Sequence, residues 1–157
     1  MDKSPIPDDK DGLREVAKYR HCFVCGEDNQ HGLQAKFYFD GKQAISSLTA
    51  TDAFEGYRGI YHGGILSAML DEVMIKAILA QDIFAVTAEL TVRFVKPVTT
   101  GDSLTFIGRV TETKGRMYMT EGEVVGSDGS AYATATGKYI KARPELQAKL
   151  MDSVDQP

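Results

Sequence analysis

Two adjacent glycines ahead of an apolar run are the residues of this 157-residue chain best suited to electrostatic chemistry. Gly63 and Gly64 follow His62, and the run after them is predicted to be helical. The first N–H groups of a helix have no partner within it, and glycine leaves them unshielded. The positive end of the helix dipole lies at the same place. Such a terminus can bind an anion, or polarise a carbonyl group whose oxygen becomes negative during attack.

An acid two turns into the same predicted helix is the second candidate. Asp71 follows Ser67 by four residues, which puts the two side chains on one side of the helix. A carboxylate in an apolar region costs free energy unless something compensates, and a partly desolvated carboxylate is a stronger nucleophile or base than one in water. The neighbouring Glu72 has Lys76 four residues later, which predicts an ordinary helical ion pair. We therefore predict that Asp71, rather than Glu72, is the functional acid.

The elements that must position these residues follow from the hydrophobic pattern. Residues Ile65 to Leu79 are apolar on nearly every side of the helix axis, which is typical of a buried helix. Strands are predicted over 33–39, 43–51, 85–95, 103–113, 117–126 and 131–141. Turn signals between the last four predict consecutive antiparallel hairpins. A single buried helix requires a sheet that curls around it, so the sequence predicts one α+β domain.

Several segments occur in an order that is specific in combination. They are Phe54-Glu55-Gly56, Tyr61-His62-Gly63-Gly64-Ile65, Leu70-Asp71-Glu72, residues 87–94, Lys96-Pro97-Val98, Gly101-Asp102 and residues 128–137. Together these segments resemble the hotdog-fold acyl-CoA thioesterases of the phenylacetate-pathway and 4-hydroxybenzoyl-CoA type, over residues 20–142. The resemblance implies a hotdog fold, with one long helix wrapped by a curved antiparallel sheet of five to six strands. It also implies a homodimer or a dimer of dimers with the active site at the subunit interface.

The resemblance also implies a role for each residue of the motif. Gly63 and Gly64 would bind and polarise the carbonyl of an acyl-CoA thioester, and Asp71 would attack it or activate a water. Thr87, from the second subunit, would orient the nucleophile or the water. His62 would contact the thioester or help to hold the carboxylate. The reaction implied is hydrolysis to a free acid and CoA, without a metal or other cofactor.

The chain departs from the family pattern at one position. Some relatives have Asn or Gln about six residues before the motif histidine, where this chain has Gly56. Glu55 is the candidate substitute for that polar group. We also assign Ser67 to substrate binding, together with Arg116 as a partner for the CoA phosphates. Other basic candidates for the phosphates are Lys114, Lys138, Lys141 and Arg143.

Two alternatives to hydrolysis use the same fold. A hotdog hydratase or dehydratase would need a catalytic histidine and acid in other motifs, which we do not find in the sequence. A non-catalytic acyl-CoA sensor would need a DNA-binding module, and about 20 residues ahead of the domain are too few for one. Tight binding of acyl-CoA without hydrolysis would nevertheless favour a binding protein.

Composition limits the other partners. The formal net charge is -4 and the pI is about 5.4, which argues against binding to nucleic acid or to an anionic membrane. The N-terminus does not resemble a signal peptide, and no apolar run reaches the roughly 18–20 residues of a membrane span. We therefore expect a cytoplasmic protein. We divide the chain into an N-terminal segment (1–20, partly disordered or a short helix around 12–19), a hotdog domain (21–142) and a C-terminal tail (143–157).

The two cysteines, Cys22 and Cys25, form a Cys-x-x-Cys pair. The chain has only three histidines, one of them in the glycine motif, so a four-ligand zinc site is not expected. A redox pair of this spacing is typically found where a helix follows a strand, whereas this one leads into a Gly-Leu turn. Similar openings occur in some hotdog thioesterases, and we predict that the cysteines pack at the entrance to the first strand.

Overall fold

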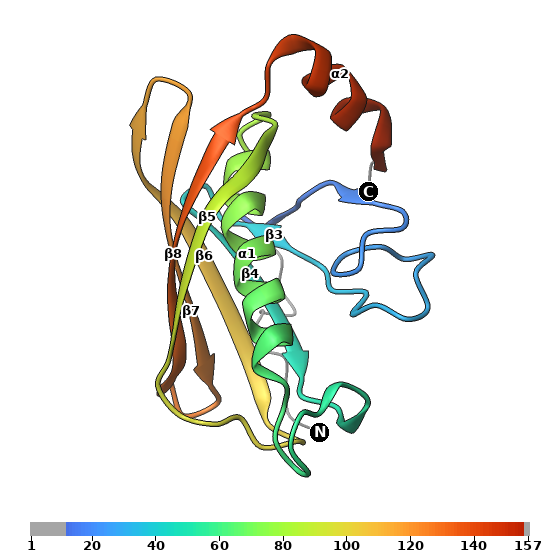
Figure 1. The fold of residues 1–157 in the computed structure, drawn as a ribbon, viewed down its shortest axis with the longest axis vertical. Helices are drawn as coiled ribbons and strands as arrows, with labels where there is room; N and C mark the ends of the chain where they lie inside the picture. Colours follow the sequence, from blue (N-terminus) through green and yellow to red (C-terminus); the bar gives the residue numbers. More distant parts are fainter. Residues whose placement is uncertain (1–11, 156–157) are drawn as a thin grey trace.

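A seven-stranded antiparallel sheet curves around one long helix in the computed structural model, which describes residues 12–155 (Figure 1). The helix is α1 (Gly63–Leu79). The sheet has the order β1-β3-β4-β6-β7-β8-β5. Its strands are β1 (Arg14–Glu15), β3 (Tyr38–Phe39), β4 (Gln43–Thr49), β5 (Ala85–Phe94), β6 (Ser103–Lys114), β7 (Met117–Gly126) and β8 (Ala131–Lys141). The predicted α+β class and the buried helix are confirmed, with more strands than the expected five to six.

Three smaller elements complete the structure. A short 3-10 helix, η1 (Asp52–Phe54), precedes the loop that leads into α1. The strands β2 (Lys18–Tyr19) and β9 (Val154–Asp155) form a separate two-stranded sheet. The helix α2 (Pro144–Ser153) occupies most of the segment predicted as a C-terminal tail. No helix among residues 12–155 is long and apolar enough to cross a membrane.

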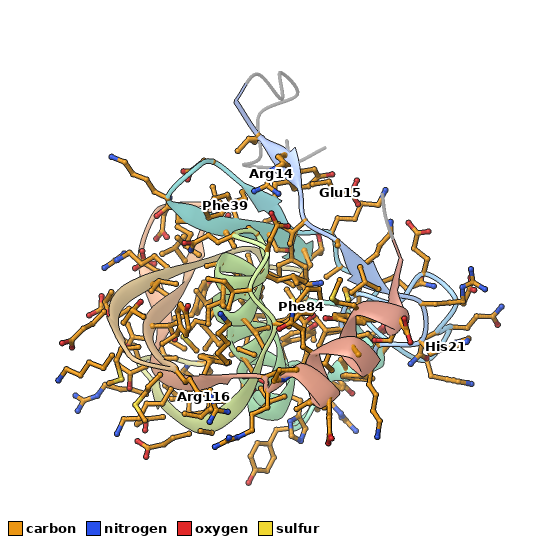
Figure 2. The ribbon with its side chains drawn as sticks, turned by 90° about the horizontal axis from the view of Figure 1, so that it is seen from above. Arg14, Glu15, His21, Phe39, Phe84 and Arg116 are labelled. Carbon is orange, nitrogen blue, oxygen red and sulfur yellow. The ribbon has the colours of Figure 1, made fainter. Side chains whose placement is uncertain are left out.

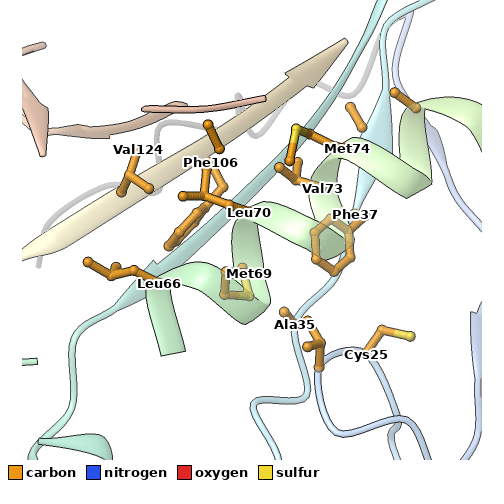
Figure 3. Packing of buried hydrophobic residues seen from close by; sticks show 14 of the residues in the cluster. Cys25, Ala35, Phe37, Leu66, Met69, Leu70, Val73, Met74, Phe106 and Val124 are labelled. Atoms are coloured by element: carbon orange, nitrogen blue, oxygen red, sulfur yellow. The ribbon is translucent and has the colours of Figure 1, made fainter. Parts of the chain in front are cut away.

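The core lies between α1 and the concave face of the sheet (Figure 3). Alternate residues of β6 and β8 are buried, as the two-residue period of a strand requires. The backbone of α1 lies against Gly108 of β6, where a Cβ atom would lie 2.7 Å from the backbone carbonyl carbon and oxygen of Val73. Glycine is needed there because the helix backbone occupies the space of a side chain.

The predicted series of consecutive hairpins is wrong for one strand. The strands β6, β7 and β8 do form hairpins, but β5 pairs with β8, and β4 pairs with β6. The helix α1 separates β4 from β5 in the chain and carries the chain across the concave face, so β5 joins the opposite edge of the sheet. Eight residues then bring the chain back to β6.

The predicted helix around residues 12–19 is also wrong. Arg14–Glu15 and Lys18–Tyr19 are short strands, and β1 extends the main sheet by pairing with β3. The predicted strand over 33–39 is reduced to Tyr38–Phe39, since Gln34 has a positive φ of 49° that interrupts an extended chain. Residues 1–11 of the predicted N-terminal segment lie outside the described residues.

Candidate active site

The start of α1 is capped by its own histidine. His62 has an extended backbone, and its Nδ1 accepts a hydrogen bond from the N–H of Gly64 at 2.8 Å. The N–H of Gly63 has no acceptor among the described residues. The first turn therefore presents one open N–H group, from Gly63, and a second that becomes available if the exposed imidazole of His62 turns away.

Close contacts explain the glycines around this terminus. A Cβ atom on Gly64 would lie 2.9 Å from Nδ1 of His62, and one on Gly63 would lie 3.3 Å from the ring of Phe94. A Cβ on Gly56 would lie 3.3 Å from Cδ2 of His62. The imidazole ring thus lies beside the position where some relatives have an amide side chain.

Two of the predicted substrate-binding residues are hydrogen-bonded to nearby backbone. The carboxylate of Glu55 accepts a hydrogen bond from the N–H of Gly59 at 3.1 Å, within its own loop. The hydroxyl of Ser67 donates to the carbonyl of Gly63 at 3.0 Å, four residues earlier in α1. The structure therefore gives both side chains a local partner and leaves their contact with substrate a prediction.

Arg116 lies far from the glycine motif along the chain, in the turn between β6 and β7. Its guanidinium donates two hydrogen bonds to the carbonyl of Lys141, at 3.2 and 2.9 Å. Figure 2 shows it well separated from His21, which lies on the other side of the molecule. Its exposure leaves phosphate binding open as a prediction.

Asp71 is held by two hydroxyl groups. Its Oδ1 accepts hydrogen bonds from the hydroxyl of Thr87 at 2.9 Å and from the hydroxyl of Tyr139 at 2.8 Å. Among the described residues no donor reaches the second carboxylate oxygen, Oδ2. The Thr87 that contacts Asp71 lies in the same chain, and not in a second subunit as expected, because β5 follows α1 and brings it to the carboxylate.

A β-bulge explains how both hydroxyls face the helix. Thr87 and Tyr139 are directly paired across β5 and β8, and so they lie on the same face of the sheet. The pairing then shifts between Thr87 and Glu89, and Leu90 is the next residue of β5 to pair with an inward position, Gly137. The extra residue lets Thr87 face α1 together with Leu90, although strict alternation would put them on opposite faces.

Tyr139 is the site residue that the sequence reasoning missed. It is fully buried, and burial followed by the nearby charge of Asp71 raises the pKa of its phenol. The phenol therefore stays protonated and acts as a donor. The signal in the sequence was the series Ala133, Ala135, Gly137 and Tyr139, one face of a strand in which only the last residue carries a polar group.

Asp71 and Thr87 line a cavity of about 300 Å³ between α1, β5 and the N-terminal segment. The other lining residues are mostly apolar, as in ligand-binding pockets generally. They are Tyr19, Cys22, Glu72, Ile75, Lys76, Leu79, Ile83, Phe84, Ala85, Val86 and Leu150. A carboxylate with one restrained and one unpartnered oxygen therefore faces a largely apolar space.

The helical ion pair predicted for Glu72 and Lys76 is present, but it is largely buried. Their ion pair exists, at 3.5 Å, but the side chain of Lys76 is 1% exposed and that of Glu72 is 15% exposed. Burial raises the pKa of Glu72 to about 7, against the lowering effect of Lys76. The ammonium group of Lys76 also donates to the carbonyl of Ala17 at 2.5 Å. The pair is buried because the N-terminal segment covers this part of α1, which the sequence did not predict.

The sulfur atoms of Cys22 and Cys25 and a carboxylate oxygen of Glu72 all lie within 4.8 Å of one another. This is the spacing of metal ligands, but the ammonium group of Lys76 lies 3.5 Å from the Cys25 sulfur and 3.5 Å from Glu72. The group thus contains its own cation, which disfavours a second one. We therefore do not identify it as a metal centre.

Comparison with known proteins finds similar thioesterases. Residues 58–133 match the family model described as the thioesterase superfamily. A solved structure named as a thioesterase superfamily protein, RHA08564, is 27% identical with a TM-score of 0.71, over 77% of this chain and 60% of that one. The PaaI protein of the E. coli phenylacetic acid degradation operon is 25% identical with a TM-score of 0.62, over 64% and 73%. These matches support the thioesterase superfamily, and the chain has the hotdog fold of these structures.

Two further relatives extend the comparison. An uncharacterized protein of Schizosaccharomyces pombe is 28% identical in an alignment of 114 residues that covers 67% of this chain and 65% of that protein. The chain therefore spans about two thirds of the length of this curated relative. A hypothetical thioesterase of Streptococcus pneumoniae, solved with coenzyme A, shares the fold at 17% identity and a TM-score of 0.62, over 64% of this chain and 79% of that one.

Proposed function

We propose that this protein hydrolyses an acyl-CoA thioester, with Asp71 as the nucleophile or general base. The observation that carries the proposal is the carboxylate of Asp71, restrained through Oδ1 by Thr87 and Tyr139 at the wall of a mostly apolar cavity. The match of residues 58–133 to the thioesterase superfamily supports the reaction class. The coenzyme A bound to the S. pneumoniae thioesterase supports the class of ligand for this fold.

The two hydroxyl groups give the carboxylate a fixed orientation. With Oδ1 held, Oδ2 is free either to attack the thioester carbonyl carbon or to take a proton from an attacking water. Attack by Oδ2 would form an anhydride between Asp71 and the acyl group, break the bond from the carbonyl carbon to sulfur and release CoA as a thiolate that takes a proton from solvent. Water would then hydrolyse the anhydride to the free acid. Attack by water, with its proton passed to Oδ2, would give the free acid and CoA directly. A restrained group accelerates reaction because its entropy is lost on folding and not in the transition state. No metal or cofactor takes part in this proposal.

We infer that the site combines residues of two chains. Gly64 and Asp71 are seven residues apart in α1, which at 1.5 Å per residue separates their backbone by about 10 Å. A helix terminus and a carboxylate acting on one carbonyl group must both lie within about 3.5 Å of it. We therefore propose that the N-terminus of α1 from a second copy, with Gly63 and Gly64, polarises the carbonyl that Asp71 attacks.

The sheet edge at β5 is a suitable contact for that second copy. Most side chains of β5 are exposed, and the backbone of the strand is paired on one side only, with β8. Phe94 at its end is 53% exposed and lies against Gly63. In a homodimer joined here, alone or within a dimer of dimers, the α1 terminus of each copy would serve the Asp71 of the other copy. The proposal includes a cytoplasmic location, where such a site would meet acyl-CoA.

The test is a panel of short, medium, long and aryl acyl-CoAs assayed for release of free thiol. We expect turnover of at least one member, and a loss of about 10²–10⁴-fold in kcat/KM for Asp71→Asn. The control is Asp82→Asn, which alters an exposed aspartate just beyond α1 whose positive φ of 61° suits asparagine. Full activity of both Asp71→Asn and Asp71→Ala would contradict the role of Asp71.

Product analysis and a binding measurement on the same acyl-CoAs separate the alternatives. A changed acyl chain on an intact thioester would show a hydratase or dehydratase instead. Tight binding of acyl-CoA without thiol release would show a binding protein. Sedimentation of the active species as a monomer would contradict the shared site.

A further inference from the structure

A second reactive group lies on the wall of the same cavity. Cys22 is half-buried and borders the space that Asp71 and Thr87 line. Cys25 lies directly behind it and is 1% exposed, packed beside Ala35 at the edge of the core (Figure 3). The proposed hydrolysis uses neither cysteine, so their environment requires its own explanation.

The turn that holds the two cysteines directs backbone donors at one sulfur. The N–H groups of Val24 and Cys25 point to the sulfur of Cys22, at 3.4 and 3.5 Å. The turn is closed by the N–H of Gly26, which donates to the carbonyl of Cys22 at 2.9 Å. A Cβ atom on Gly26 would lie 2.5 Å from that carbonyl oxygen, so the turn requires glycine after the Cys-x-x-Cys. Donors arranged in this way stabilise a thiolate.

The charged groups around the pair come from two other elements. From α1, Lys76 places its buried ammonium group 3.5 Å from the sulfur of Cys25, and Glu72 places a carboxylate oxygen 3.9 Å from that of Cys22. From β2, the ring of Tyr19 lies 5.3 Å from the ammonium group. The Cys25 thiol first, then the two N–H groups and Lys76, lower the pKa of Cys22 to about 5 against the effect of burial. The hydrogen bond of the Cys25 thiol to Cys22, together with burial, raises the pKa of Cys25.

We propose that Cys22 and Cys25 form a dithiol–disulfide exchange site, with Cys22 as the attacking thiolate, Cys25 as the resolving thiol and a low-molecular-weight disulfide as the substrate. The asymmetry of the pair assigns these roles. Cys22 faces the cavity and has the donors, whereas Cys25 is out of reach of solvent and adjacent to the sulfur that it would attack.

The reaction balances as two exchanges. The Cys22 thiolate attacks one sulfur of the disulfide RSSR, the S–S bond breaks, and RS⁻ leaves with a proton from solvent. Cys25 then attacks the sulfur of Cys22 in the mixed disulfide and passes its proton to Glu72, and the second RS⁻ leaves. The protein dithiol is oxidised by two electrons, and RSSR is reduced to two thiols. Reduction by an excess of thiol runs the same steps backwards.

The experiment treats the reduced, full-length protein with glutathione disulfide and follows the intact mass. We expect wild type to lose two hydrogen atoms and retain no glutathione. Cys25→Ser should stop at the mixed disulfide and retain one glutathione, and Cys22→Ser should retain none. Equal glutathione uptake by Cys22→Ser and Cys25→Ser, or a wild-type protein that remains unmodified, would overturn the proposal.

A pH profile tests the thiolate independently of access to the cavity. Alkylation of Cys22 by iodoacetamide should be only about twice as fast at pH 8 as at pH 5, whereas an ordinary thiol of pKa near 8.5 would gain several hundred-fold. A gain of the ordinary size would overturn the role of Cys22. A second control adds Zn²⁺ alone to the reduced protein. If the protein retained one equivalent of Zn²⁺ and both thiols became protected from alkylation, the group would be a metal site, and the proposal would be overturned. None of these readouts depends on thioester hydrolysis.

Discussion

The hydroxyl of Tyr139 should contribute to stability mainly through its bond to the carboxylate of Asp71. Tyr139→Phe removes one oxygen atom from a fully buried side chain and leaves the ring in place, so it creates almost no cavity. The bond is 2.8 Å long and its acceptor is a carboxylate. Hydrogen bonds to charged groups contribute about 1.5–3 kcal/mol, and bonds between neutral groups about 0.5–1.5 kcal/mol. We expect Tyr139→Phe to lower the free energy of unfolding at pH 7 by about 1.5–3 kcal/mol.

A double-mutant cycle separates this bond from other effects of the substitution. In an Asp71→Asn background the acceptor is neutral, so Tyr139→Phe should cost only about 0.5–1.5 kcal/mol. The four proteins are compared by urea unfolding, with Thr87→Ser as a control that retains the second hydroxyl at Oδ1. The same cost of Tyr139→Phe in both backgrounds would refute the reasoning, because the phenol would then not be bound to the charge of Asp71.

Two further predictions concern the helix that carries the site. Gly108→Ala forces a Cβ atom to within 2.7 Å of the backbone of Val73. It should lower the free energy of unfolding, measured by urea denaturation, by at least ~2 kcal/mol. An unchanged stability would show that α1 can move away from β6. Glu72 has a pKa of about 7 when folded and ~4.3 when unfolded. The folded protein binds the extra proton between those values, so stability falls as pH rises through this range, by about 3–4 kcal/mol for this group. Glu72→Gln should remove that fall. The free energy of unfolding is measured between pH 4 and 8 with and without Glu72→Gln, both in a Cys22→Ser background. Parallel pH profiles of the two proteins would contradict the raised pKa.

The disulfide-exchange site and the proposed hydrolysis share one cavity wall. A group attached to Cys22 would occupy space that Asp71 and Thr87 border. The two reactions nevertheless use different atoms, the Asp71 carboxylate and the cysteine sulfurs, and they are measured by different assays. Loss of either leaves the other to be judged on its own measurements.

The sequence by itself determined the class of fold and the composition of the α1 terminus. The helix over 63–79 is apolar on nearly all sides, and the strands that follow it alternate, so a buried helix inside a curved sheet is the arrangement that hides the apolar surface. The His62, Gly63 and Gly64 terminus is likewise local, because residues adjacent in the chain make its contacts. Periodicity and turn chemistry report such short-range interactions directly.

Tertiary structure alone decided which groups surround Asp71. Tyr139 is 68 residues away in the chain, and its approach depends on β5 and β8 pairing at the far edge of the sheet. Thr87 reaches the same carboxylate within one chain only because a bulge shifts the alternation of β5. The burial of Lys76 and Glu72 depends on the N-terminal segment that covers them. Pairing partners, bulges and covering segments are set by long-range packing, and a local hydrophobic pattern does not encode them.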